Sequence, residues 1–485
     1  MYKRDHSNIL LVHPLGYKKE AAGRDVSRLA NIMPPLGLLS IGAYIEREGI
    51  DSSIIDCYAY PESDALIRSY LLEKRPRFIG LSCTTSSFFD GIRIANMAKG
   101  IIPDIKVIFG GPHVSALKEK ILQAFPQVDY CIIGEGEITL TELIESGEED
   151  PSSIKGLVYR DPQREICSNG HRPNITDLDT MPFPAYKKLK GYPDAYKLPI
   201  FNYPRTPNAS CISSRGCPYT CTYCDRSVFR SSFHYNSAEY VYDHLRYLKT
   251  HFGVRHINFY DDQFTFNRKR IESLTEMMIK RPLSMTFNCA VRAEHIDADL
   301  ARQMKKAGCW MISLGIETGD EKLLAQHRRH ADLDVLTKKI SIIKNEGIRT
   351  KGLFMIGLPG ETEITIKKSI SYFLSLPIDD LNVAKFTPFP GSPLYQNIHQ
   401  LGEFKEDWEK MDCMHFLFIP RGMKREVLEE YFIRFYKAHF LRIRILWDYF
   451  TMLWRSPDSW RRFIGNLRGF IKFARSDKRL GDIEI

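Results

Sequence analysis

The chain has 485 residues, too many for one hydrophobic core, so we expect two to four domains. Its residues are 44% hydrophobic and 26% charged, which excludes a wholly disordered or fibrous chain. No apolar run reaches the roughly 18 residues of a membrane-spanning helix, and the first residues make a poor signal peptide, so the sequence predicts a cytoplasmic protein. Most of the net charge of +9 comes from residues 421–480, with 15 Lys and Arg against 6 Asp and Glu.

Apolar runs and helical patterns alternate along residues 1–150, which we interpret as the first domain. This alternation predicts a Rossmann-like, doubly wound parallel sheet with helices on both faces. Ligands of such sheets bind outside the carboxyl ends of the strands, so the polar and glycine-rich segments there are expected to face a common ligand. The predicted strands are residues 8–13, 52–57, 78–83, 105–109 and 130–133.

A connector with a short hairpin is expected at residues 151–205, followed by a second alternating series at 206–400. Six strand–helix units predict a partial (β/α)6 barrel with function at the carboxyl ends of its strands. After residue 400 the strand pattern stops, and 401–485 is predicted to be helical, with a break at Ser456-Pro457. The predicted barrel strands are residues 209–213, 256–260, 284–288, 310–315, 350–355 and 382–387.

Three cysteines follow the first predicted barrel strand at spacings of four and three residues: Cys217, Cys221 and Cys224. Three thiolates at this spacing can surround one metal centre and leave one ligand position open, as in an iron–sulfur cluster with an exchangeable ligand. A zinc site completed by Cys211 or a histidine, and a redox thiol site, are the alternatives. Five other cysteines lie in apolar segments and are predicted as core residues: Cys57, Cys83, Cys131, Cys289 and Cys309.

The motif CxxxCxxC, with Tyr223 before its last cysteine, resembles the signature of the radical S-adenosylmethionine (SAM) superfamily. The resemblance implies that Cys217, Cys221 and Cys224 bind a [4Fe–4S] cluster whose open iron chelates SAM, and that Tyr223 packs beside the cluster or the adenine. Reduction of the cluster then cleaves SAM to a 5′-deoxyadenosyl radical.

Later strand ends supply the SAM contacts that the resemblance implies: Asp261, Asp262, Asn288, Arg292, Glu317, Ile356 and Gly357. Arg292 is expected to pair with the SAM carboxylate and Glu317 to accept the ribose hydroxyls. Asp261-Asp262 stands where the family usually has Gly-Gly-Glu. Judged by residues alone, the two aspartates could instead cap the next helix, and Glu317 could be an ordinary strand-end carboxylate.

The first domain resembles the cobalamin-binding class of radical SAM enzymes, which includes the anaerobic magnesium-protoporphyrin ester cyclase and radical C-methylases. The resemblance covers residues 8–400. His13 stands in Leu11-Val12-His13-Pro14-Leu15-Gly16, which keeps His and Gly of the cobalamin motif Asp-x-His-x-x-Gly but lacks its Asp. Cobalt ligation by His13, cobalamin without a protein ligand, and a domain that binds no cobalamin are therefore all open. The expected cobalamin contacts are His13, Ser82, Thr84, Gly110, Gly111, Gly134 and Glu135.

The resemblance implies an enzyme that methylates an unactivated carbon; cyclisation, rearrangement or oxidation with the same cofactors is the alternative. The implied partners are a small-molecule or lipid substrate and an electron donor such as flavodoxin or ferredoxin. A methylthiotransferase acting on tRNA would need three further cluster cysteines, whereas Cys57, Cys83 and Cys131 lie in strands. The non-enzyme alternative is a zinc- or cluster-stabilised protein whose basic tail binds nucleic acid, a partner that we do not expect.

Aromatic residues and arginines alternate in the C-terminal region, which holds Trp447, Trp454 and Trp460. This composition suits an amphipathic helix at the inner face of a membrane. Packing of the aromatic rings onto the barrel, with solvated arginines, is the alternative.

Overall fold

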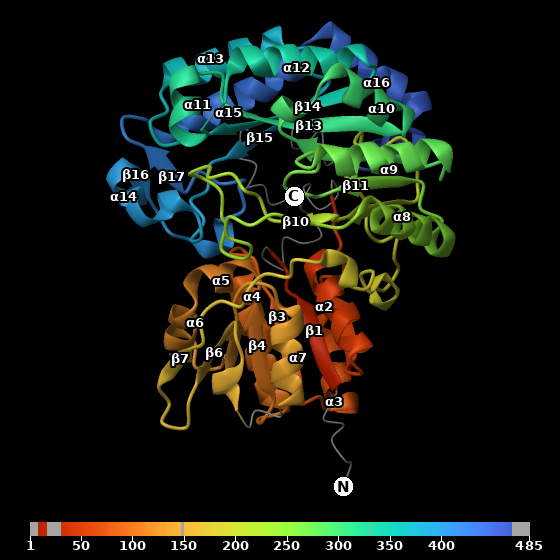
Figure 1. Ribbon diagram of the computed structural model, residues 1–485. Coiled ribbons are helices and arrows are strands. Elements are labelled where there is room, and N and C mark those ends of the chain that lie inside the picture. Colours follow the sequence, from red (N-terminus) through yellow and green to blue (C-terminus); the bar gives the residue numbers. More distant parts are fainter. Residues whose placement is uncertain (1–7, 17–30, 147–149, 330, 468–485) are drawn as a thin grey trace.

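The structure, a computed structural model, describes residues 8–16, 31–146, 150–329 and 331–467. The N-terminal α/β unit lies below a second α/β unit in Figure 1, and loops from both meet between them. None of the helices in these described segments is long and apolar enough to cross a membrane.

The first sheet has seven strands in the order β2-β1-β3-β4-β5-β6-β7. Strands β1 (Asn8–His13), β2 (Asp51–Asp56), β3 (Phe78–Ser82), β4 (Lys106–Gly110) and β5 (Tyr130–Ile132) are parallel, as expected. The hairpin β6 (Leu157–Arg160) and β7 (Ile166–Ser168) was expected in the connector, but it extends this sheet in the antiparallel sense.

Both faces of this sheet are covered by helices, so its central strands are apolar throughout. In β1, Ile9 and Leu11 belong to the core on one face, whereas Leu10 and Val12 belong to the core on the other. Two short helices follow β4 in place of one longer helix, because Lys118 at φ 52° separates them. The helices are α2 (Leu36–Arg47), α3 (Asp64–Lys74), α4 (Phe88–Ile101), α5 (Pro112–Leu117), α6 (Glu119–Ala124) and α7 (Glu137–Glu145).

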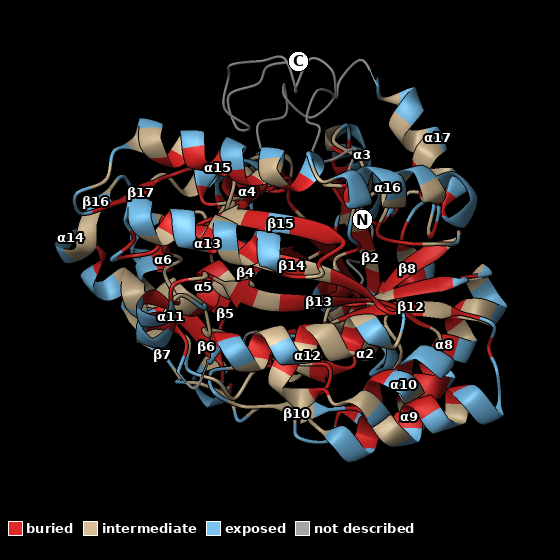
Figure 2. Cartoon of the chain, turned by 90° about the horizontal axis from the view of Figure 1, so that it is seen from above, coloured by how far each residue is buried: buried red, intermediate tan, exposed pale blue. Residues whose placement is uncertain are grey.

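The second sheet is a partial barrel of six parallel strands in the order β15-β14-β13-β12-β11-β8, which confirms the predicted fold class. Figure 2 shows these strands as a buried layer, with helices whose outer faces are exposed packed around them. The strands are β8 (Asn208–Cys211), β11 (His256–Phe259), β12 (Thr286–Val291), β13 (Cys309–Glu317), β14 (Arg349–Ile356) and β15 (Asp380–Lys385).

Polar side chains begin the helices that follow these strands. Asn267, Asp297 and Asp332 each accept a hydrogen bond from a backbone N–H in the first turn, as do Ser237, Asp320 and Thr362. Each cap of this kind stabilises its helix by about 1 kcal/mol. The helices are α8 (Ala238–Phe252), α9 (Arg268–Lys280), α10 (Ala298–Lys306), α11 (Glu321–His327), α12 (Leu333–Asn345) and α13 (Glu363–Ser375).

The region after residue 400 corrects one expectation, because a short antiparallel pair, β16 (Gly402–Phe404) and β17 (Phe418–Pro420), follows the barrel. Three residues per strand are too few for a recognisable alternating pattern. Helices α14 (Ile398–Leu401), α15 (Arg425–Phe440), α16 (Ile443–Arg455) and α17 (Pro457–Gly465) complete the described chain, and the predicted break at Ser456-Pro457 is confirmed.

Trp408, in the short helix η7 (Trp408–Lys410), connects the C-terminal region to the first unit. Its ring lies 4.4 Å from that of His113 and stacks 5.3 Å from that of Phe89. This aromatic contact joins the two units at one side of the space between their strand ends.

Candidate active site between the two sheets

A cavity of about 710 Å³ lies between the two sheets and is lined by strand-end loops of both. Ser82, Gly110, Gly111, Gly134 and Glu135 line it from the first sheet, and Cys217, Cys221, Cys224, Tyr223, Asp262, Arg292 and Glu317 line it from the second. The structure therefore brings most of the sequence-predicted residues of both sets to one space.

The loop that carries the three cysteines is held from beneath by Asp261. Its buried carboxylate accepts hydrogen bonds from the Ser213 backbone N–H at 3.1 Å and from the Ser213 and Ser214 hydroxyls at 2.7 and 2.5 Å. The guanidinium of Arg270 donates to the Ser213 carbonyl at 3.0 Å. Farther along the loop, the Thr222 backbone N–H donates to the His327 carbonyl at 3.1 Å. These contacts fix the loop on the strands and on α11.

The environment of the three thiols favours a metal-binding thiolate at Cys221. A hydrogen bond with Cys224 lowers the pKa of Cys221, and Arg292 and Arg328 add positive charge in the same direction. The thiolate is the form of cysteine that ligates metals. Cys211 does not line the cavity; its buried sulfur lies 3.5 Å from Nδ1 of His244.

No group of three or more His, Cys, Asp or Glu side chains in the described segments is arranged to hold a single metal ion. A cubane is a different case, because each of its cysteines binds a separate iron and the sulfurs lie farther apart.

Glu317 enters the cavity wall at the end of β13, where the pairing with β14 shifts register between Gly315 and Glu317. Its φ of 68° is unusual for a residue other than glycine and marks local backbone strain. Burial raises the pKa of Glu317 to about 7, although the nearby Arg328 guanidinium opposes that rise.

Arg292 and Arg328 form the cationic part of this wall. The Arg292 guanidinium carbon lies 3.9 Å from the centroid of the Tyr219 ring, and both arginines contact Glu294 at 3.2 Å. Arg328, which is 3% exposed, also donates to the Gly315 carbonyl. This arrangement presents positive charge to the cavity beside Glu317.

Four of the expected SAM contacts do not line the cavity: Asp261, Asn288, Ile356 and Gly357. Asn288 is buried and donates to the Asn202 carbonyl at 2.6 Å. The backbone N–H of Gly357 donates to the buried carboxylate of Glu361. These four residues do not line the cavity, whereas Asp262 does.

The glycines of the first sheet bring bare backbone to the cavity. Gly111 has φ 97°, and a Cβ there would lie 2.6 Å from the Cys83 carbonyl oxygen, so no other residue fits without movement. Gly134 has φ 82°, and its backbone N–H donates a hydrogen bond to Ser115 Oγ at 3.0 Å. Thr84 is exposed and does not line the cavity.

His13 ends β1 outside the cavity wall. Its Nδ1 lies 2.8 Å from Oδ1 of Asp56, which ends the neighbouring strand β2. A carboxylate on one ring nitrogen orients an imidazole so that the other nitrogen is available to a ligand. Asp56 is thus placed to orient the His13 imidazole.

An ion-pair network joins the two sheets across the cavity, and sequence reasoning did not single it out as a unit. Arg215, two residues before the first cysteine of the triad, contacts Glu135 at 2.6 Å and Glu137 at 2.7 Å, and it donates to the Ser40 hydroxyl at 2.9 Å. Burial alone would raise the pKa of Glu137, but the Arg215 guanidinium holds it below its usual value. The only sequence signal was the position of each residue in a glycine-flanked motif.

Comparison with known proteins agrees with this geometry. A model of the B12 binding domain matches residues 25–144, and a model of the radical SAM superfamily matches residues 211–373. An uncharacterized methyltransferase of Pyrococcus horikoshii, PH0819, is 30% identical over 75% of this chain and 78% of its own length. The chain belongs to the B12-binding radical SAM family.

Other known proteins resemble the chain over a greater length. The anaerobic magnesium-protoporphyrin IX monomethyl ester cyclase of Rubrivivax gelatinosus is 26% identical over 98% of this chain and 84% of its own. The solved structure of the radical SAM methyltransferase TsrM from Kitasatospora setae has a TM-score of 0.65 at 18% identity, covering 83% of this chain and 77% of that one. This likeness confirms the fold. Family membership also identifies the chain as an enzyme.

Proposed function

We propose that the chain is a cobalamin-dependent radical SAM methyltransferase that methylates an unactivated carbon. The observation that carries this proposal is the meeting of the cysteine loop, Glu317 and the strand-end glycines of the first sheet in one cavity. Relatives named as methyltransferases, including PH0819, support methyl transfer. We assign cobalamin to the domain at residues 1–150 and SAM to the barrel at 206–400, with 151–205 as connector and 401–485 as a helical C-terminal region.

The residues present fit these cofactors. Cys217, Cys221 and Cys224 are soft sulfur donors on one loop, and three such donors suit a cluster that keeps one iron open. The bare backbone at Gly110 and Gly111 lets a large planar ligand approach the first sheet closely. When bound, the reduced cluster and SAM supply a 5′-deoxyadenosyl radical, and cobalamin supplies the methyl group.

The chain's own part in the reaction is to bind, orient and exclude water. We assign Glu317 as the acceptor for the ribose hydroxyls of SAM, Arg292 as the partner of its carboxylate and Asp262 as a contact to its amino group. Tyr223 packs beside the cluster. Ser82, Gly110, Gly111, Gly134 and Glu135 form the cobalamin side, while His13 and Thr84 lie outside the cavity and contribute only if the ligand extends beyond it.

Apolar side chains make up much of the remaining wall, including Leu36, Ile41 and Phe229. They favour an apolar small-molecule substrate, and a lipid is one such class. The reaction needs an external reductant, for which we propose flavodoxin or ferredoxin. A cytoplasmic location stays a prediction, and so does contact with the inner face of the membrane.

Anaerobic turnover tests the proposal. Protein reconstituted with iron, sulfide and cobalamin is incubated with SAM, dithionite and candidate substrates, and the products are quantified by mass spectrometry. Methyl transfer predicts S-adenosylhomocysteine together with 5′-deoxyadenosine. The cyclase relative, which matches 98% of this chain, favours a second candidate, cyclisation or oxidation, for which 5′-deoxyadenosine would form without S-adenosylhomocysteine.

A further inference from the structure

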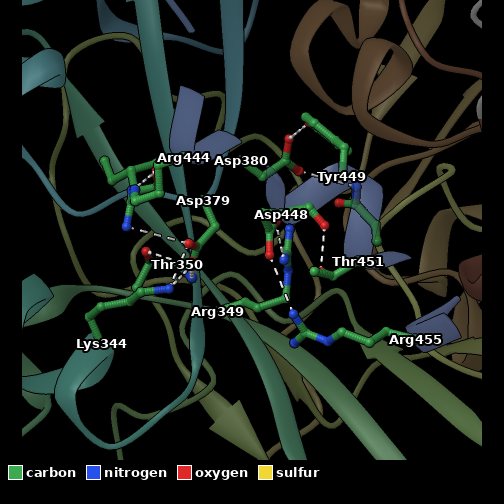
Figure 3. A network of polar contacts seen from close by, with 12 residues as sticks. Lys344, Arg349, Thr350, Asp379, Asp380, Arg444, Asp448, Tyr449, Thr451 and Arg455 are labelled. Carbon is green, nitrogen blue, oxygen red and sulfur yellow. Dashed lines mark hydrogen bonds and ion pairs between the residues drawn. The ribbon is translucent and has the colours of Figure 1, made fainter. Parts of the chain in front are cut away.

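Helix α16 packs on the barrel through its polar face (Figure 3). Asp448 accepts a hydrogen bond from Arg349 at 2.5 Å, and the Tyr449 hydroxyl donates to Asp380 at 3.4 Å. Arg349 and Asp380 begin the strands β14 and β15, so these contacts attach the helix to the end of the sheet opposite the strands' carboxyl ends. Only Ile445 and Met452 of α16 are buried apolar residues.

Further polar contacts fix α16 at its beginning. The Arg444 guanidinium donates to the Ile378 carbonyl at 2.7 Å and lies 3.8 Å from Asp379, whose carboxylate also pairs with Lys344 at 2.6 Å. The Arg442 guanidinium donates to the Leu376 carbonyl at 3.1 Å. Rotation of α16 to bury its apolar side would break these contacts, several of which are shielded from water, so the orientation of the helix is stable.

The opposite face of α16 is apolar and exposed. Ile443 is 85% exposed, Trp447 66% and Trp454 70%. The Phe450 ring lies 5.4 Å from Trp447 and 5.3 Å from Trp454, which makes the aromatic surface continuous. The members recur three or four residues apart, so they share one side of the helix. We call this surface the outer stripe; it consists of Ile443, Leu446, Trp447, Phe450, Leu453 and Trp454.

Arginines flank the outer stripe at both ends. Arg444, next to Ile443, has a side chain that is 44% exposed and contacts Asp379. Arg455 and Arg461 follow Trp454 with side chains that are 46% and 80% exposed, and they contact Asp448 and Asp458. In a two-fold pair of copies with antiparallel α16 helices, the arginines of one end would meet those of the other, a repulsive arrangement. The anionic phosphates of a bilayer surface match this charge instead.

We propose that the outer stripe docks on the surface of an anionic lipid bilayer. The tryptophans, Phe450 and the aliphatic residues enter the boundary between headgroups and acyl chains, while Arg455 and Arg461 contact lipid phosphates. No stripe residue lines the cavity, so the docking surface is separate from the candidate active site and its test does not depend on the proposed function.

Vesicle co-sedimentation of the full chain tests the proposal. We expect the protein to pellet with vesicles of phosphatidylcholine and phosphatidylglycerol, and to pellet much less with phosphatidylcholine alone. The double variant Trp447→Ser, Trp454→Ser is expected to lower the partition coefficient about tenfold or more, because two largely exposed indoles no longer enter the lipid. Arg455→Gln, Arg461→Gln is expected to weaken binding to the anionic vesicles only.

A matched control is the double variant Leu72→Ser, Ile364→Ser, which removes residues 60% and 66% exposed on α3 and α13. It is expected to bind vesicles as the unchanged chain does. Equal unfolding temperatures of all variants show that the surface alone is altered. Vesicle binding that survives Trp447→Ser, Trp454→Ser would overturn the proposal. So would a dimer, seen by light scattering, that this double variant dissociates, because the stripe would then face a second copy.

Discussion

The guanidinium of Arg215 lies 2.6 Å from the carboxylate of Glu135, although 80 residues separate them in the chain. Arg215 belongs to the loop of the three cysteines and Glu135 to a strand-end loop of the first sheet, so this pair joins the two sides of the candidate active site. Its side chains are only 16% and 6% exposed, and Glu137 completes the network at 2.7 Å. Arg215 therefore helps to set the relative position of the two sheets, together with the contact of Trp408 with His113 and Phe89.

Replacing Arg215 with Met is expected to destabilise the protein by about 3–5 kcal/mol, because Glu135 and Glu137 stay in a poorly solvated site without a counter-charge. Urea unfolding at pH 7 measures the effect. Arg268→Met is the control, since Arg268 pairs with Asp297 at an exposed position, where the loss is expected to stay below about 1 kcal/mol. If the two variants lost the same free energy of unfolding, the role assigned to Arg215 would be contradicted.

Changing Asp261 or its neighbour Asp262 to Ala is expected to have different effects on stability and on SAM binding. Asp261→Ala leaves Arg270 buried and removes the acceptor of three donors beneath the cysteine loop, so a loss of about 3 kcal/mol or more is expected. Asp262→Ala is expected to change stability by less than about 1 kcal/mol and to weaken SAM binding instead. Thermal unfolding and calorimetric titration with SAM separate the two outcomes, and a reversed pattern would show that the assignments are wrong.

This pair of aspartates shows how far the sequence could predict the site. Buried runs such as Asn8–His13 are apolar on both faces, so the strands and the fold class could be predicted from composition and period. The direction of a side chain just beyond a strand end depends on loop geometry, so the sequence could not tell which aspartate reaches the cavity. The same limit applies to Glu317, whose direction follows a local register shift.

Contacts between segments that are distant in the chain could not be predicted from the sequence. The pairing of His13 with Asp56 depends on the register of β1 against β2, and that of Arg215 with Glu135 depends on how the two sheets dock. The sequence also left two interpretations of the C-terminal aromatic residues. The structure places these residues in two different environments. Phe435 packs on the barrel, whereas Trp447 and Trp454 are exposed.

Glu317→Gln tests the proposed SAM contact. The variant keeps the size of the side chain but removes the charge that strengthens a hydrogen bond to the ribose hydroxyls, so the dissociation constant for SAM is expected to rise about 10- to 100-fold. Isothermal titration of the anaerobically reconstituted protein gives this value. Glu321→Gln, an exposed change on α11, is expected to bind SAM normally. If Glu317→Gln bound SAM with unchanged affinity, Glu317 would not be a contact of SAM.

Glu361 predicts a pH dependence of stability. It is 1% exposed, Oε1 has no hydrogen-bond partner among the described residues, and burial raises its pKa to about 8. Between about pH 4.3, its ordinary pKa, and pH 8 the unfolded chain loses this proton while the folded chain keeps it. The free energy of unfolding therefore falls as pH rises through this range.

Glu361→Gln removes this titration, so the stability of the variant relative to the unchanged chain is expected to rise by about 2–4 kcal/mol from pH 5 to pH 8. Urea unfolding at the two pH values measures the change. Glu363→Gln, at a side chain that is 51% exposed, is the control and is expected to keep the pH dependence. If Glu361→Gln changed the free energy of unfolding by the same amount at pH 5 and at pH 8, the assignment would be contradicted.

The proposed function requires that Cys217, Cys221 and Cys224 hold a cluster with one iron open to SAM. Anaerobic reconstitution with iron and sulfide, followed by EPR spectroscopy after dithionite reduction with and without SAM, tests it most directly. We expect a [4Fe–4S] signal that SAM shifts, present in Cys211→Ala and absent in the triple variant with all three cysteines changed to Ala. A SAM-sensitive cluster signal that persists in the triple variant would contradict it.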